Sequence, residues 1–291
     1  MALSFTMPSA EHTQLAESPP RVASAGVQGS KGAPPPRVAI VLRPRSAAAL
    51  GELALRFVVD LAPGLQIVLC VFALLPGFVL TATARHVFEL EWVWVWAIAL
   101  SYGCAVRGVF VCASHHILLA KRPSVADVIV AWRSRAVADW VNALVFLPVR
   151  ALATVSLVGS FVARRLAFTR VVALSEIHSG KSLVKAMRHA ARRSWFLTPP
   201  GGTPVGRVEL LNVLVTLSSV GLSEILGRGI VEQLLMLDPE SVLAELPAGG
   251  LFGLLGYFLS IPFTTAAGYL AYIDGRTRRG DWEAVSSAWK P

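Results

Sequence analysis

Charged residues and cysteines are scarce in this sequence of 291 residues. Charged side chains account for 15% of the chain, against about 25% in soluble globular domains, and hydrophobic side chains account for 54%. This scarcity excludes an ordinary water-soluble enzyme and predicts a membrane protein. The three cysteines, Cys70, Cys104 and Cys112, all lie in apolar runs. An odd number of cysteines inside hydrocarbon excludes a disulfide framework, so we interpret them as packing residues.

Acidic residues are the minority among the charges, with 18 Asp and Glu against 27 Lys and Arg. The basic excess lies in the polar segments between the apolar runs. We interpret it as a signal that retains loops in the cytoplasm and contacts anionic lipid headgroups. The expected partners are therefore anionic membrane lipids, together with either a membrane-protein partner or a second copy of the chain, and no nucleic acid.

Large apolar residues are sparse in the first part of the chain. Residues 1–42 are rich in Ser, Ala, Pro and Gly, and they lack a basic segment followed by an unbroken apolar stretch. We therefore expect no cleavable signal peptide and interpret these residues as a disordered cytoplasmic tail. A docking peptide is the alternative interpretation. The membrane domain is predicted over residues 43–284, and residues 285–291 are predicted to form a short cytoplasmic tail.

Long apolar runs are what the sequence has in abundance. The runs at 64–84, 92–113, 210–225 and 249–272 approach or exceed the length that crosses about 30 Å of hydrocarbon as a helix. They predict four membrane spans. The last run also contains small residues that favour close packing between helices, including Gly253, Gly256, Ala266, Ala267 and Gly268.

A fifth apolar run, residues 138–163, determines the topology. Its length suits one tilted helix better than two full spans, but Pro148 and Arg150 interrupt it near the middle. A single crossing would place the basic region 164–207 outside, against the positive-inside tendency, whereas a hairpin places all basic regions in the cytoplasm. We therefore predict an all-α polytopic transmembrane helical bundle of six segments, with both termini cytoplasmic. The return leg 151–163 reaches only about 20 Å, so the hairpin is shallow or draws the following arginines into the bundle.

Three amphipathic helices are predicted to rest on the membrane surface. They begin at Ser46, at Ser124 and near Ser182, and each has an apolar side and a charged side. The third is strongly basic and is predicted to contact lipid headgroups through Lys181, Lys185, Arg188, Arg192 and Arg193. The end of the last span adds Arg276, Arg278 and Arg279 to this set. The cluster that they form with Asp274 is either a charge signal for orientation or an ion-paired lock onto the basic helices or lipid phosphates.

Polar residues within the apolar runs are rare, and four of them are candidate functional residues: Arg107, Asn142, Arg150 and Glu224. Arg107 is expected about 9 Å from the inner end of its span, within reach of the headgroups. Asn142 is predicted to bond between helices, Arg150 to lie at the hairpin tip, and Glu224 near the outer boundary. A continuous polar cavity lined by Arg107, Asn142 or Glu224 would favour the alternative function, a small-solute transporter or channel.

The sequence lacks a recognisable catalytic or metal-binding pattern. Cys112, His115 and His116 lie close together, and His178 follows Glu176 by two residues, but neither spacing is a zinc signature. No nucleophile, base and orienting group converge in the sequence either. We therefore expect no enzymatic activity, no catalytic residues, no metal and no cofactor.

Four stretches occur in an order and spacing known from one family: RPRSAAALGELALRF (43–57), AKRPSVADVIVAW (120–132), VVALSEIHSGKSLVKAMRHAARRSWFL (171–197) and YLAYIDGRTRRGDWEA (269–284). Together they resemble the bacterial membrane-domain family named after the membrane part of glycerophosphoryl diester phosphodiesterase. The resemblance implies a six-segment helical bundle of largely uncharacterised role in a bacterial inner membrane. Phosphodiesterase chemistry belongs to a separate soluble barrel, whose His-Arg-Gly start is not found in this sequence.

The third and fourth segments look shorter here than the usual pair of that family. With no catalytic pattern and with basic helices beside the spans, we expect a scaffold, an assembly partner or a lipid-organising component of the membrane.

Overall fold

The computed structural model describes residues 45–119, 124–137, 139–143, 145–146, 162, 164–175, 183–198, 205–234 and 250–279. All regular elements in these ranges are helices, which confirms the all-α prediction. The chain divides into two units, 1–39 and 40–291, and every described residue belongs to the second. The predicted tails, most of the run 138–163, the hairpin residue Arg150 and the basic residue Lys181 lie outside the described residues.

The first helix, α1 (Ala47–Arg56), begins where the sequence predicts. The Ser46 hydroxyl caps it by accepting a hydrogen bond from the Ala49 backbone N–H at 3.2 Å. Such a cap satisfies one of the backbone donors that the first helical turn leaves unpaired. Leu50 and Ala54 are buried, and Glu52 pairs with Arg56 on the exposed side at 2.7 Å.

Prolines shape the first membrane span. The helices α2 (Pro63–Leu69), η2 (Cys70–Leu74) and α3 (Leu75–His86) follow one another without a break. η2 is a wide π turn directly before Pro76, and a second π turn, η1 (Phe57–Leu61), precedes Pro63. Proline lacks a backbone N–H, and its ring collides with the carbonyl group four residues earlier. The wider turn η2 relieves that collision at Pro76 without ending the helix, whereas η1 ends before Ala62, which is not helical, and α2 begins anew at Pro63.

Four helical stretches in the described part of the chain are long and apolar enough to cross a membrane: Pro63–His86, Trp92–Leu118, Val205–Gly227 and Leu251–Arg278. They coincide with the four predicted spans. Two of the helices extend beyond the apolar runs, since α4 (Trp92–Leu119) continues past Ala113 and α10 (Val205–Leu234) begins before Leu210. Polar residues end an apolar run but do not by themselves end a helix, so hydropathy underestimates the length of both.

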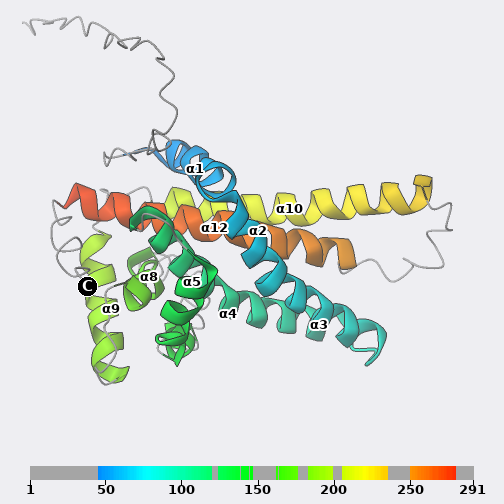
Figure 1. The fold of residues 1–291 in the computed structure, drawn as a ribbon, viewed down its shortest axis with the longest axis horizontal. Helices are drawn as coiled ribbons and strands as arrows, with labels where there is room; N and C mark the ends of the chain where they lie inside the picture. The colour runs from blue at the N-terminus through cyan, green and yellow to red at the C-terminus, as the bar shows by residue number, and fades with distance from the viewer. Residues whose placement is uncertain are drawn as a thin grey trace, which may run out of the picture. The chain divides into compact units, whose positions relative to one another are not determined.

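The last helix, α12 (Leu251–Arg278), is the centre of the bundle. It runs beside α10, and the two are drawn in orange to red and in yellow in Figure 1. They are antiparallel, because Gly253 contacts Glu224 whereas Ser260 contacts Thr216. The helices α4 and α1 also pack on α12. Of its most apolar window, 67% is buried, against 6% for α10, so α12 forms the core and α10 lies at its edge.

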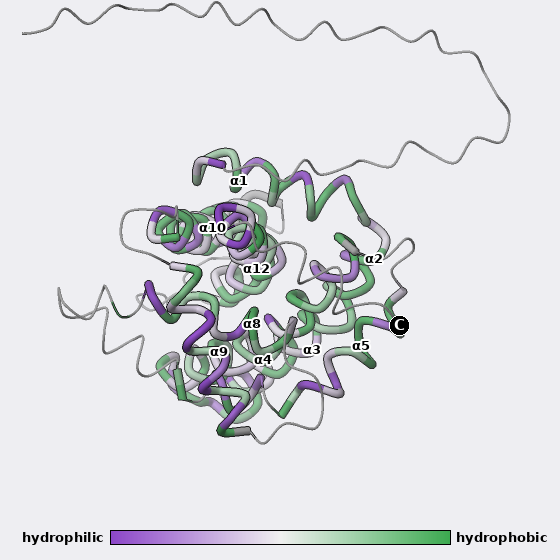
Figure 2. Tube along the Cα trace, turned by 90° about the vertical axis from the view of Figure 1, so that its left-hand side faces the viewer, coloured by the Kyte–Doolittle hydropathy of each residue, from purple (hydrophilic) through white to green (hydrophobic). Residues whose placement is uncertain are grey.

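Three shorter helices pack beside the spans. α5 (Val125–Arg133) begins at Ser124, whose hydroxyl accepts a hydrogen bond from the Asp127 N–H at 3.2 Å, as the sequence predicts. α8 (Thr169–Ser175) is buried along most of its length and contacts α9 (Leu183–Leu197) and α4. Figure 2 shows long hydrophilic stretches on α9, where the sequence predicts the basic helix.

The inner side of α9 is held by one buried serine. The Ser194 hydroxyl donates to the Arg165 carbonyl at 2.6 Å and accepts from the Phe168 N–H at 3.0 Å. Ala186 and Ala190 lie on the same side of the helix and are also buried. These small residues bring α9 close to the turn that leads into α8, so its orientation on the bundle is fixed by specific contacts.

Candidate functional site

A cavity of about 770 Å³ lies among α4, α8, α10 and α12. α4 and α10 each pack on α12, and the cavity occupies the space that they leave beside it. Most of the lining side chains are apolar, and a smaller number of polar groups come from α4, α10, α12 and the segment around Asn142. A volume of this size falls within the roughly 300–1,000 Å³ of ligand-binding cavities in proteins.

Arg107 lines this cavity from α4. The span continues to Leu118, so Arg107 lies 11 residues, or about 16 Å, before its end, farther than the expected 9 Å. Its Nε atom is buried and has no hydrogen-bond partner among the described residues. Two other lining residues also have a buried polar atom without a hydrogen-bond partner among the described residues: Asn212, through Oδ1, and Thr265, through Oγ1. Buried polar atoms are nearly always paired in proteins, so three in one cavity call for an explanation.

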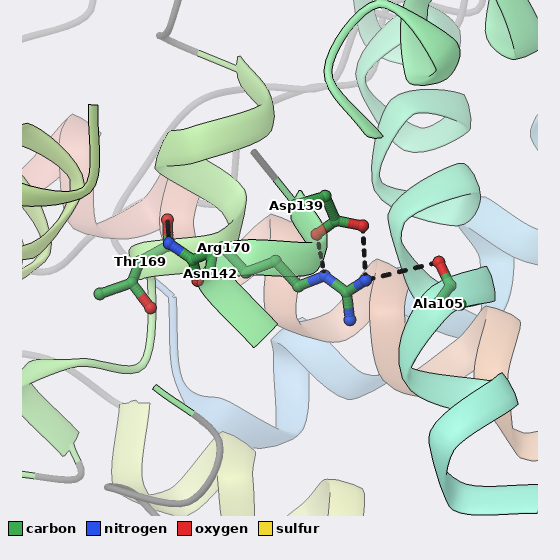
Figure 3. Close-up of polar contacts among 5 residues, drawn as sticks. All are labelled: Ala105, Asp139, Asn142, Thr169 and Arg170. Atoms are coloured by element: carbon green, nitrogen blue, oxygen red, sulfur yellow. Dashed lines mark hydrogen bonds and ion pairs between the residues drawn. The ribbon is translucent and has the colours of Figure 1, made fainter. Parts of the chain in front are cut away.

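A buried ion pair adjoins the cavity (Figure 3). Arg170 of α8 donates from Nε and from one terminal nitrogen to the two carboxylate oxygens of Asp139, at 2.6 and 2.7 Å. The side chain of Asp139 is 1% exposed and that of Arg170 is 18% exposed. The same terminal nitrogen lies 3.5 Å from the Ala105 carbonyl of α4. The pair therefore ties the segment around Asp139 and α8 to α4.

Gly108 makes room for this pair. A Cβ atom at Gly108 would lie 2.1 Å from Asp139 Oδ2 and 2.8 Å from Trp132 Nε1. The absence of a side chain at this position of α4 thus lets the carboxylate approach the helix. A two-point contact between guanidinium and carboxylate is the strongest ion-pair geometry, and inside a membrane it leaves neither charge uncompensated.

Asn142 is the predicted interhelical residue that the structure describes most clearly. Its side chain is buried, lines the cavity, and donates to the Thr169 carbonyl of α8 at 3.5 Å. Figure 3 shows this contact beside the Asp139–Arg170 pair. The structure thus supports the predicted role of Asn142 in joining two segments.

Glu224 has a different position from the cavity-lining residues. Its Oε2 accepts a hydrogen bond from the Gly253 backbone N–H at 2.8 Å. Gly253 lies in the first turn of α12, where backbone donors have no partner within the helix and a negative charge is favourable. Gly250 precedes that helix and has no side chain to cap it. Glu224 therefore caps α12 from the neighbouring helix α10.

The charged end of α12 is an internal lock. Asp274 Oδ1 accepts from the Arg45 backbone N–H at 2.7 Å, and Asp274 Oδ2 accepts from Arg278 Nε at 2.6 Å. Arg278 also donates to the Arg45 carbonyl at 2.8 Å. The ion pair of this cluster joins two residues of α12, and its contacts to the residue before the cap of α1 are hydrogen bonds to the Arg45 backbone. The predicted lock onto the basic helices or lipid phosphates stays a prediction, as does the charge signal for orientation.

Arg276 departs from the predicted contact with lipid headgroups. Its residue exposure is only 3%, and its guanidinium donates to the Tyr272 hydroxyl at 2.9 Å. That hydroxyl also accepts from the Ser175 hydroxyl of α8 at 3.3 Å. Arg276 points into the bundle because this side of α12 is covered by α8 and α9, so it stabilises the fold rather than meeting a lipid.

The other predicted headgroup residues in the described ranges lie at the surface. Lys185, Arg188 and Arg192 are exposed on α9, as are Arg278 and Arg279 at the end of α12. The guanidinium groups of Arg193 and Arg279 lie over the Phe196 ring, at 5.7 and 4.7 Å. Phe196 and Val184 are exposed as well, so this surface combines cations with apolar side chains.

The histidines near the end of α4 have protein partners. The Nδ1 atom of His115 lies 2.9 Å from the Tyr269 hydroxyl, and that of His116 lies 2.9 Å from the Cys112 carbonyl oxygen. No group of three potential metal ligands occurs among the described residues. Glu176 and His178 lie outside them.

Arg135 is a half-buried cation outside the four candidate spans. Its guanidinium donates to the Leu174 carbonyl at the end of α8. Burial lowers the pKa of Arg135, while the neighbouring Cys112 acts in the opposite direction. An arginine remains charged in spite of such a shift, so this contact compensates the carbonyl groups that a helix end leaves unpaired.

Several residues of the site do not stand out in the sequence. Arg170 was assigned to a basic cytoplasmic region, although it turns inward to Asp139. The signal that points to this pair is Asp139 itself, because an aspartate inside an apolar run requires a cation. Asn212 and Thr265 were not singled out, because single polar residues in a span are common and only the packing shows that they face one cavity.

Comparisons of this chain with protein-family models, with known proteins and with solved structures found no match.

Proposed function

We propose that this chain is a lipid-organising or scaffolding protein of a bacterial inner membrane. In the proposal it has six segments and cytoplasmic termini, and the helices α1, α5 and α9 rest on the inner leaflet as amphipathic helices. The proposal includes no enzymatic activity and no cofactor. Membership of the membrane-domain family that the sequence resembles belongs to the same proposal.

The observation that carries it is the composition of the α9 surface. Lys185, Arg188 and Arg192 are exposed on a helix that also exposes Val184 and Phe196. Cations and apolar side chains on one exposed surface are the signature of a helix at an anionic lipid interface. Cations near such a surface contribute about 1 kcal/mol each.

The attachment of α9 to the bundle supports the same function. Ser194 fixes the helix on the turn before α8, and Arg279 at the end of α12 stacks on Phe196. The basic surface is therefore held in one orientation relative to the spans. A rigidly held cationic surface retains anionic lipids beside the protein at a smaller entropic cost than a mobile one.

The experiment uses the full-length protein in vesicles of phosphatidylcholine with a minority of phosphatidylglycerol. Spin-labelled phosphatidylglycerol and phosphatidylcholine report which lipid is immobilised beside the protein. Combined Lys185→Gln, Arg188→Gln and Arg192→Gln substitutions are expected to lower the preference for the anionic lipid severalfold. The charge-preserving control, Arg188→Lys with Arg192→Lys, is expected to keep that preference. An equal preference in the neutral variant and the wild type would refute the proposal.

A small-solute transporter or channel is the second candidate, and the cavity is the observation that favours it. Arg107 and Asn142 line the cavity, whereas Glu224 caps α12 instead. The described lining runs from Leu100 to Val111 on α4 and from Tyr257 to Ala271 on α12, so it leaves out the first turns of both helices. This arrangement fits a binding cavity better than a pathway across the bundle. Solute uptake by protein-containing vesicles above that of empty vesicles would favour the transporter instead.

A further inference from the structure

We propose that the cavity among α4, α8, α10 and α12 binds one anionic membrane phospholipid, with its phosphate at Arg107. This inference deepens the proposed function, because it rests on the chain being embedded in a lipid bilayer. It concerns a site within the bundle, distinct from the basic surface of α9.

The charges around the cavity single out Arg107. Three charged side chains line it: Arg107, Arg170 and Glu209. Asp139 neutralises Arg170 through two short contacts. Glu209 also has an interaction partner. Among the described residues, Arg107 has no carboxylate partner and its Nε atom has no hydrogen-bond partner. A cation in hydrocarbon without a counter-charge is costly, so an anionic ligand would stabilise this position.

The polar groups that line the cavity together with Arg107 match a phosphate ester better than a simple apolar ligand. A planar guanidinium binds phosphate oxygens with two parallel hydrogen bonds. Thr265 brings a hydroxyl to the same cavity, and its Oγ1 atom has no partner among the described residues. Asn142 and Asn212 add amide groups to the lining. These groups come from four different segments and converge only in the folded bundle.

The rest of the lining fits acyl chains. Val111, Phe146 and Val208 contribute apolar surface to the cavity. On α10, Leu210 and Leu217 line the cavity although they are 59% and 63% exposed, so they belong both to the cavity and to the outer surface of the bundle. The cavity therefore communicates with the lipid-facing side of α10. A phospholipid reaches it laterally from the bilayer, whereas a water-soluble anion would have to cross apolar side chains.

Gly268 permits a direct test of occupancy. It lines the cavity, and a Cβ atom at this position meets no atom within 4 Å. The open space at this Cβ lets a leucine at 268 occupy part of the cavity. Gly221 of α10 is the matched control, because a Cβ atom there also meets nothing within 4 Å and the residue does not belong to the described lining.

The first experiment is native mass spectrometry of the full-length protein in detergent, titrated with phosphatidylglycerol, phosphatidylcholine or inorganic phosphate. We expect one phosphatidylglycerol to bind in preference to phosphatidylcholine. Gly268→Leu is expected to weaken that binding at least tenfold, and Gly221→Leu to leave it unchanged. Arg107→Gln is expected to abolish the preference between the two lipids. Unchanged binding by Gly268→Leu, or an unchanged preference in Arg107→Gln, would overturn the inference.

The second experiment needs no substitution and therefore does not depend on the folding of a variant. Cys104 lines the cavity, whereas Cys70 lies on η2 outside the described lining. Saturating phosphatidylglycerol is expected to slow alkylation of Cys104 by N-ethylmaleimide at least threefold and to leave Cys70 unaffected. Equal protection by inorganic phosphate would identify a site for a free anion, and absence of protection would exclude the lipid; either result contradicts the inference.

The two proposals fail separately. The neutral α9 variant, with Lys185, Arg188 and Arg192 replaced by glutamine, retains the cavity and should show the same Cys104 protection as the wild type. Loss of Cys104 protection in Gly268→Leu, together with a preference for anionic lipid that the neutral α9 variant retains, supports the cavity site alone. Intact Cys104 protection in Gly268→Leu with a lost surface preference in the α9 variant supports the proposed function alone.

Discussion

The helices α10 and α12 lie side by side but differ in how deeply they are buried in the protein. Their most apolar windows have similar mean hydropathy, 1.6 for α10 and 1.4 for α12. Yet 67% of the α12 window is buried inside the protein and only 6% of the α10 window is. The more buried helix is the less apolar one. In a membrane the lipid is as apolar as the protein core, so burial follows from close packing rather than from hydropathy.

Small residues account for the deeper burial of α12 compared with α10. Gly256 of α12 packs against Ser219 of α10, whose hydroxyl donates to the Gly256 carbonyl at 2.8 Å. Ala266 and Ala267 of α12 are also almost fully buried. On α10, by contrast, large residues such as Leu222 and Ile225 are 58% and 70% exposed. The small-residue surface that the sequence predicts on the last span is thus a packing surface.

The largest effect is expected where α10 and α12 approach most closely. A Cβ atom at Gly256 would lie 2.3 Å from the Ser219 carbonyl oxygen. This oxygen belongs to the backbone of α10, so it cannot rotate away as a side chain could. Gly256→Ala is therefore expected to lower the free energy of unfolding by about 3 kcal/mol. The measurement is unfolding in mixed micelles with increasing sodium dodecyl sulfate.

The matched substitution on α10 should have the opposite sign. A Cβ atom at Gly221 meets nothing within 4 Å, and alanine is a better helix former than glycine. Gly221→Ala is therefore expected to raise the free energy of unfolding by up to about 1 kcal/mol. Equal effects of the two alanine substitutions would show that the close approach does not hold the helices together.

A smaller contrast is expected between a buried and an exposed leucine. Leu254 of α12 is 0% exposed, and Leu222 of α10 is 58% exposed. Leu254→Ala is expected to cost about 2 kcal/mol because it leaves a void in packed protein. Leu222→Ala is expected to cost less than about 0.5 kcal/mol, because lipid fills the space. Thermal unfolding in detergent, followed by size-exclusion chromatography, ranks the two variants; an equal loss at both positions would contradict the assignment of α10 to the edge.

The smallest effect is expected at the cap between the two helices. Glu224→Gln retains a hydrogen-bond acceptor for the Gly253 N–H but removes the negative charge at the start of α12. The expected cost is about 1 kcal/mol. Glu52→Gln is the control, because the pair of Glu52 with Arg56 is exposed on both sides and contributes little. Hydrogen exchange of the first turn of α12 should increase in the Glu224 variant and stay unchanged in the control.

Local signals in the sequence predicted the local features of the fold. Ser46 and Ser124 marked the starts of α1 and α5, because a serine hydroxyl caps a helix wherever it stands before an apolar repeat. The four apolar runs marked the four spans for the same reason, since length and hydropathy are properties of the segment alone. The hairpin predicted over 138–163 stays a prediction, because most of that run lies outside the described residues.

The candidate site was less predictable. Arg107 and Asn142 stood out as polar residues in apolar runs, and both line the cavity. Arg276 and Arg170 were assigned to the basic surroundings of the spans, although both turn inward, to Tyr272 and to Asp139. A basic residue near the end of a span looks the same in sequence whether it faces lipid or protein, since only its neighbours differ.

The sequence by itself determined which segments are long and apolar enough to cross a membrane, where helices begin and where the positive charge is concentrated. These properties depend on residues within one or two turns of each other. Only the tertiary structure decided that α12 is central and α10 peripheral, that Asp139 neutralises Arg170, and that Arg107 faces a cavity with no carboxylate partner in the described part of the chain. Each of these depends on which helix lies opposite. Hydropathy does not determine which helices pack together in an apolar solvent. Small residues that allow close approach and polar residues that pair across helices do.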